Sequence, residues 1–96
     1  MNGVRGEVEV ELAGARRRLC VTLGALAEIE TALGLEGVGD LADRLRQPSA
    51  RDLAVVLAAL LRGGGEAGLA EGVEGAAIDP RAAAEAIATA FAAAGG

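Results

Sequence analysis

The first part of the chain alternates between apolar and polar residues. In residues 7–12, glutamates alternate with valine and leucine, and residues 19–23, LCVTL, have the same two-residue period. Side chains of a β-strand point to opposite faces in turn, so this period is typical of a strand with one buried face. The pattern predicts an antiparallel β-hairpin over about residues 5–23.

A tight turn separates the two predicted strands. Gly14 and Ala15 form a two-residue loop with glycine first, which favours a type II′ turn. Such a loop fixes the register and gives the hairpin one apolar and one charged face. The expected cross-strand pairs are Val8 with Val21, Val10 with Leu19, and Glu11 with Arg18.

Beyond the hairpin, apolar residues recur at helical spacing. Thr22 is placed to cap a first helix, and Gly34 is placed to end it. Ser49 with Asp52 has the spacing of a capping box, and Pro80 suits the first position of a last helix. Helices are predicted over about residues 23–33, 40–46, 50–62 and 80–93.

The helix predicted over 50–62 is apolar on nearly every side. Its leucine and valine stripe should face the core, and its opposite side carries Val55, Ala58 and Ala59 in place of charges. We therefore expect this helix to be central. Val55, Ala58 and Ala59 are our candidate partner-binding surface, and the alternative is that the last helix covers them.

Glycines interrupt the chain after this helix. Residues 63–78 contain six of them, and each destabilises a helix by about 1 kcal/mol relative to alanine. We expect a flexible segment with at most a short helix over Leu69–Val73. The tract is too short to separate two domains, so residues 1–96 are predicted to form a single domain. The expected fold class is α+β, an N-terminal antiparallel β-hairpin packed on a bundle of three to five short helices.

The charge balance narrows the range of partners. Nine basic residues stand against 14 acidic ones, which gives a net charge of −5 and a pI near 4.6. Phosphate binding needs a concentrated positive field, so nucleic acid is not an expected partner. The longest apolar run is too short to cross a bilayer, and the start lacks a signal-peptide pattern. Cys20 is the only cysteine, so no internal disulfide is expected and the cytoplasm is the expected location.

The residue inventory argues against catalysis. Without histidine, and with one cysteine, the chain lacks imidazole-based triads, Cys-His pairs and ordinary zinc sites. The carboxylate pairs Glu28 with Glu30 and Asp40 with Asp43 are best explained as solvated helix residues. We therefore expect a protein that is not an enzyme and has no catalytic residue, no cofactor and no metal.

Two motifs resemble anion sites but have simpler explanations. The basic run Arg16–Arg18 lies on the second strand, where alternation places two of its arginines beside Glu9 and Glu11. The glycine tract at 62–66 follows a helix and lacks the Lys-Ser/Thr of a phosphate loop. We interpret it as a helix end followed by a flexible loop.

The stretch Gly6–Glu30, GEVEVELAGARRRLCVTLGALAEIE, resembles the start of small proteins encoded among the tail genes of alphaproteobacterial gene transfer agents. The matching features are a glycine and an acid opening an alternating strand, the tight turn at Gly14, and the entry into the first helix. Looser likeness continues in residues 41–45, 52–57 and 61–65, so the resemblance covers roughly residues 4–65.

This resemblance implies a phage tail assembly chaperone, a group sometimes labelled as tail tube proteins. Such a protein would hold the tape-measure protein or tube subunits in an assembly-competent state, so tail proteins are the expected partners. One alternative is a structural tail component that stays in the particle and pairs through the strand at 7–12. Another is a small regulatory binding module. Self-association into a homo-oligomer is compatible with these readings.

Overall fold

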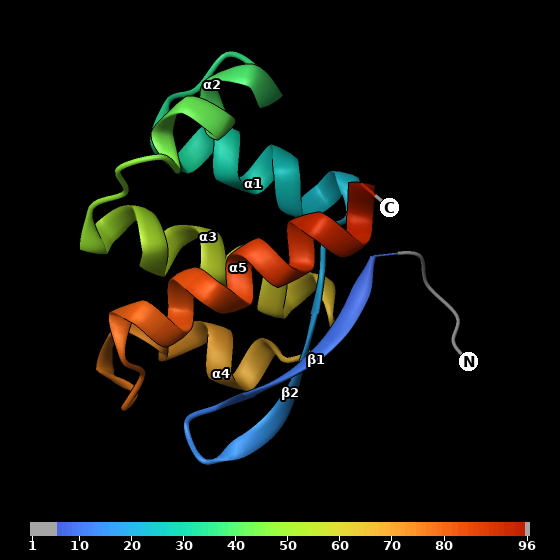
Figure 1. Ribbon diagram of the computed structural model, residues 1–96, viewed down its shortest axis with the longest axis vertical. Coiled ribbons are helices and arrows are strands. Elements are labelled where there is room, and N and C mark those ends of the chain that lie inside the picture. The colour runs from blue at the N-terminus through green and yellow to red at the C-terminus, as the bar shows by residue number, and fades with distance from the viewer. Residues whose placement is uncertain (1–5, 96) are drawn as a thin grey trace.

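The computed structural model describes residues 6–95, and the first residue of the hairpin predicted from about 5 lies outside this range. A two-stranded antiparallel sheet precedes five α-helices and a short 3-10 helix, which confirms the α+β prediction (Figure 1). The elements are β1 (Glu7–Leu12), β2 (Ala15–Cys20), α1 (Leu23–Leu33), α2 (Val38–Arg44), α3 (Ala50–Gly63), α4 (Ala67–Glu71), η1 (Val73–Gly75) and α5 (Pro80–Gly95).

The hairpin forms as expected, but the predicted register is wrong by two residues. The turn consists of Ala13 and Gly14, because Leu12 pairs with Ala15. Both turn residues have positive φ, 53° and 82°, as a type I′ turn requires and the expected type II′ turn does not. A shift of two leaves every side chain on its face, so alternation alone could not detect it. The observed pairs are Glu7 with Cys20, Val8 with Leu19, Glu9 with Arg18, Val10 with Arg17, Glu11 with Arg16, and Leu12 with Ala15.

Helix α3 is the centre of the fold, as its all-round apolar sequence predicted. It packs against α1, α4, α5 and β2, and in Figure 1 α5 crosses in front of it while α1 and α4 lie on either side. Its side chains supply much of the core, and Val56, Leu60 and Leu61 are fully buried. The hairpin adds Leu19 from its apolar face, so sheet and helices share one core.

Local capping signals set several helix ends. The Thr22 hydroxyl accepts a hydrogen bond from the Ala25 N–H at 2.9 Å, and Gly34 ends α1 with a φ of 69°. Helix α2 begins two residues before the predicted start at 40. Asp40 lies inside its first turn and accepts a hydrogen bond from the Glu36 N–H at 3.1 Å.

The segment predicted to be flexible over 63–78 contains α4 and η1. Ala70 is buried, and Leu69 and Val73 are half-buried against the core. Gly68 is the one glycine within α4, so only this residue destabilises the helix relative to alanine. Apolar packing of α4 on α3 offsets that destabilisation. Helix α5 extends to Gly95, two residues beyond the predicted end at 93.

Candidate protein-binding site

The surface predicted at the back of α3 is mostly covered. Ala58 is 7% exposed and Ala59 is fully buried, so the premise of a spare apolar surface is wrong for these two residues. Helices α1 and α4 pack over this side of α3, whereas the last helix was the cover expected from the sequence. Val55 is half-buried and lines a depression beside the ion pair of Arg62 with Glu28. The partner-binding role of Val55, Ala58 and Ala59 stays a prediction.

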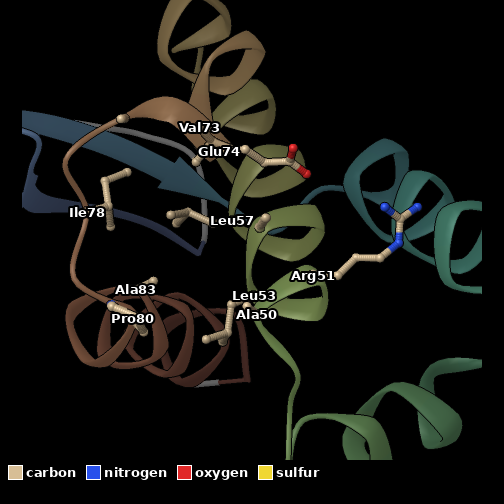
Figure 2. A pocket seen from close by; sticks show the side chains of 11 residues that line it. Ala50, Arg51, Leu53, Leu57, Val73, Glu74, Ile78, Pro80 and Ala83 are labelled. Carbon is tan, nitrogen blue, oxygen red and sulfur yellow. The ribbon is translucent and has the colours of Figure 1, made fainter.

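An apolar pocket of about 400 Å³ lies between α3, the segment after η1 and the start of α5. Leu53, Leu57 and Ile78 form its walls (Figure 2). The charged ends of Arg51 and Glu74 lie on the far side of α3 from Ile78 in this view. Neither of these two charged side chains therefore points into the pocket in Figure 2.

A second apolar pocket, of about 280 Å³, opens between α2, the start of α3 and α5. Val38, which is 56% exposed, lies at its edge, and Ile87 and Phe91 line it from α5. Its lining is also nearly all aliphatic. Both pockets offer apolar contact area and no assembled reactive groups.

Among the titratable groups of residues 6–95, Cys20 and Asp52 have a clearly displaced pKa. Burial, and secondarily the charge of Glu7, raises the pKa of the Cys20 thiol, which stays protonated and unreactive at neutral pH. Burial alone would raise the pKa of Asp52. Hydrogen bonds from Ser49 and Arg44, together with the charge of Arg44, outweigh burial and lower that pKa. Asp52 therefore serves the capping box of α3, in which it accepts from the Ser49 N–H at 3.0 Å. Residues 6–95 contain no cluster of three potential metal ligands.

The glycine tract after α3 closes the outer edge of β2. A side-chain carbon at Gly63 would overlap the carbonyl oxygen of Cys20, and one at Gly64 would overlap the carbonyl oxygen of Arg18. Glycine therefore permits close approach of the helix end to the strand backbone. Gly65, with a φ of 85°, completes a helix-ending turn in which the N–H of Glu66 donates to the α3 backbone at 2.8 Å. The interpretation of this tract as a helix end is confirmed, because α3 ends at Gly63, and the flexibility of the loop that follows stays a prediction.

Glu66 completes this closure. Its carboxylate accepts a hydrogen bond from the Arg18 N–H at 3.0 Å, on the side of β2 that faces away from β1. The Arg17 guanidinium lies 4.0 Å from the other carboxylate oxygen and also donates to the Leu12 carbonyl. The outer backbone edge of β2 is thus occupied within the same chain at Arg18 and Cys20.

The outer edge of β1 contrasts with that of β2. In an antiparallel pair, facing residues alternate between bonding each other and pointing their N–H and C=O groups outward. Because the Arg18 N–H points outward to Glu66, its partner Glu9 also points outward, as does Glu11 two residues on. Within residues 6–95, no backbone hydrogen bond from another segment reaches these two glutamates. Their backbone groups form an open strand edge.

The side chains along this edge are acidic. Glu9 and Glu11 are exposed on the charged face of the hairpin, and Glu9 forms an ion pair with Arg16 at 3.1 Å. The predicted neutralisation of the arginine run by Glu9 and Glu11 is thus confirmed for Glu9 with Arg16. On the opposite face, Val8 and Val10 are half-buried against the core. The open edge therefore has one acidic and one apolar side.

The sequence predicted strand β1 and its two faces, but it did not predict which outer edge of the hairpin is closed. The available signal was the run of three glycines followed by an acid at 63–66, since consecutive glycines also mark close backbone approach. The partner of that tract lies more than 40 residues away, as the pairing of Arg18 with Glu66 across 48 positions shows.

The fold and its surfaces define a small α+β domain with an open strand edge and apolar contact pockets. Comparison with family models places the chain more narrowly. The model described as "Phage tail tube protein, GTA-gp10" matches residues 5–94, where GTA denotes gene transfer agent, and the chain belongs to this phage-tail family. The match extends through α5, well beyond the likeness seen in the sequence over 4–65.

Two further comparisons were negative. A search of curated proteins and a search of solved structures each found no match to this chain. Within residues 6–95, no helix has both the length and the apolar character that crossing a membrane requires.

Proposed function

We propose that this chain is a non-enzymatic assembly factor for a phage-like tail, which binds another tail protein and keeps it competent to assemble. The observation that carries the proposal is the asymmetry of the hairpin. Glu9 and Glu11 present an open backbone edge, whereas Gly64 and Glu66 close the edge of β2. A domain with one open edge can accept one strand from a partner.

This asymmetry favours a chaperone over a subunit that polymerises through its sheet. Head-to-tail assembly requires two different complementary surfaces on each subunit, one for each neighbour. Because the edge of β2 is closed, the sheet can supply only one of these two surfaces, the edge of β1. Pairing of β1 with β1 of a second copy would place glutamates opposite glutamates, which is destabilising. The tape-measure protein and the tube subunits are the partners we propose.

The described residues also suit a binding protein better than an enzyme. The two displaced pKa values belong to a buried thiol and to a helix cap, and neither group faces the apolar pockets. The inventory without histidine points the same way. We place the binding step in the cytoplasm, where the partner polypeptides are synthesised.

A structural tail-tube component is the second candidate, and the description of the family as a tail tube protein favours it. Such a component could contact its neighbours through the apolar pockets instead of the sheet. It would remain in the finished particle in stoichiometric amounts, whereas a chaperone leaves. The two candidates therefore differ in a quantity that is simple to measure.

The test combines co-expression with analysis of particles. The tagged chain is expressed with the tape-measure and tube proteins of the same tail, and captured partners are identified by mass spectrometry. The proposal expects a stable complex with one of these proteins before assembly and depletion of the chain from purified particles. Stoichiometric retention in particles would instead support the structural component. Failure to capture either tail protein would remove the basis of the proposal.

A further inference from the structure

We propose that the outer edge of β1 binds an extended segment of the partner in which basic residues alternate with apolar ones. This inference rests on the function proposed above and adds the chemistry of the bound segment. It joins two independent observations, namely the open backbone at Glu9 and Glu11 and the division of the edge into an acidic and an apolar side.

The backbone supplies the binding mode. Addition of a strand to an exposed sheet edge satisfies the unpaired N–H and C=O groups of both chains, and side chains then select the sequence. Glu9 and Glu11 offer such groups on the side of β1 that faces away from β2. The other edge is unsuited because Glu66 already accepts from Arg18.

The acidic side selects for positive charge. Residues of the incoming strand that bond to Glu9 and Glu11 place their side chains directly beside these carboxylates. Arg16 already pairs with Glu9, but both side chains are largely exposed, 69% and 57%, so the pair is weak and leaves Glu9 accessible. Lysine or arginine in the incoming strand is therefore favoured at alternate positions.

The apolar side selects for aliphatic residues at the positions between. Val8 and Val10 point to the other face and are half-buried where the hairpin packs on the core. An incoming strand places every second side chain beside these valines and extends the apolar face. An alternating basic and aliphatic sequence satisfies both faces, whereas an alternating acidic sequence meets repulsion on one of them.

A second copy of this chain is the wrong occupant. Its open edge carries glutamate at each outward position, so any β1 to β1 register pairs like charges. Its basic strand, β2, has its outer edge covered by Gly63 and Gly64. The partner must therefore be a different polypeptide with positive charge.

The test uses synthetic end-blocked peptides of the length of β1 and the folded, full-length protein. In the first peptide lysine alternates with valine, in the second glutamate replaces each lysine, and in the third the residues of the first are reordered so that they do not alternate. Binding is measured by titration calorimetry, and hydrogen exchange of the Glu9 and Glu11 amides is followed by NMR. We expect the first peptide to bind at least about tenfold more tightly than the others and to protect both amides.

A matched pair of variants separates backbone pairing from charge. Glu9→Pro removes the outward N–H and leaves the bonds between β1 and β2, since proline is tolerated on strand edges. Glu9→Ala removes the same carboxylate but keeps the N–H. We expect Glu9→Pro to lose peptide binding and Glu9→Ala to retain it within about threefold, because one exposed carboxylate contributes little. Thermal unfolding confirms that both variants are folded, and Glu11→Pro with Glu11→Ala serves as a second pair if Glu9→Pro is not.

The outcomes distinguish this inference from the function on which it rests. If the wild-type chain captures a tail protein and Glu9→Pro captures it equally well, the β1 edge is not the site, and the proposed function stands. Equal binding of the alternating and reordered lysine peptides would reduce the effect to general charge attraction and overturn the inference. So would a dimer of the wild-type chain that Glu9→Pro abolishes, because the occupant would then be a second copy.

Discussion

The two strands of the hairpin have the same length, but their outer edges differ, because the edge of β2 is closed by another segment and the edge of β1 is open. At the edge of β2, the end of α3 approaches so closely that only glycine fits at positions 63 and 64, and Glu66 bonds the outward N–H of Arg18. At the edge of β1, the outward N–H and C=O groups of Glu9 form no backbone hydrogen bond with another segment within residues 6–95. Isolated strand edges promote unwanted association, so closing one and placing acids on the other limits the hairpin to selected partners.

The largest expected effect comes from breaking the closed edge. Gly64→Ala would place a methyl group against the backbone of Arg18. The methyl group is fixed to the backbone at position 64 and meets the backbone of β2, so neither segment can move aside easily. We expect a loss of about 3 kcal/mol or more in the free energy of unfolding, measured by urea denaturation.

Gly68→Ala is the matched control for this variant. Gly68 lies within α4, and nothing lies within 4 Å of an added side-chain carbon there. This change should leave stability unchanged or raise it by up to about 1 kcal/mol. If Gly64→Ala is as mild as Gly68→Ala, the close approach of α3 to β2 does not exist in solution.

Low pH should lower the stability of the domain through Asp52, which lies at the opposite end of α3 and is hydrogen-bonded to Ser49 and Arg44. Hydrogen bonds and the nearby arginine hold the pKa of Asp52 below its ordinary value of 3.8 despite burial. The ionised carboxylate therefore stabilises the fold fully above that value, and the contribution is lost as pH falls through the lower, folded-state pKa. We expect Asp52→Asn to cost about 2 kcal/mol at neutral pH.

The pH profile checks the sign of this effect. The stability difference between wild type and Asp52→Asn should shrink below pH 3.8 and not above it. In the variant the edge of β2 should stay closed and the edge of β1 open, because Asp52 lies at the far end of α3 from the glycine tract. A difference that is independent of pH would show that Asp52 is not the group that titrates.

The smallest expected effect comes from the hydrogen bond that the Glu66 carboxylate accepts at the edge of β2. Glu66→Ala removes the acceptor of the Arg18 N–H, whereas Glu66→Gln keeps an amide oxygen in its place. We expect Glu66→Ala to cost about 1 kcal/mol and to speed exchange of the Arg18 amide, with Glu66→Gln in between. If the Arg18 amide exchanges equally slowly in all three proteins, Glu66 is not what closes the edge.

Local patterns in the sequence predicted the local structure. The caps at Thr22 and Ser49 depend on residues within one turn of helix, and both form as expected. Alternation likewise placed Val8, Val10 and Leu19 on the apolar face, although β2 ends at Cys20 and not at the predicted end at 23. It could not distinguish registers that differ by two, and the choice depended on Ala13 adopting the positive φ of a type I′ turn.

Long-range contacts explain what the sequence did not predict. The glycine run at 63–65 can mark close backbone approach, but nothing near it identifies a strand more than 40 residues earlier as the segment approached. Cover of Ala58 and Ala59 likewise depends on the docking of α1 and α4, and the glycine-rich stretch containing α4 offered little helical signal. The candidate surface at the back of α3 was misjudged for that reason.

Hydrogen exchange of the hairpin amides, compared between the free protein and its complex with a tail protein, shows whether the partner binds at the outer edge of β1. We predict that the Arg18 amide exchanges slowly in both states, whereas the Glu9 and Glu11 amides exchange rapidly in the free protein and slowly in the complex. Rapid exchange of Glu9 and Glu11 in a complex that is fully formed would contradict it, because the partner would then be bound elsewhere.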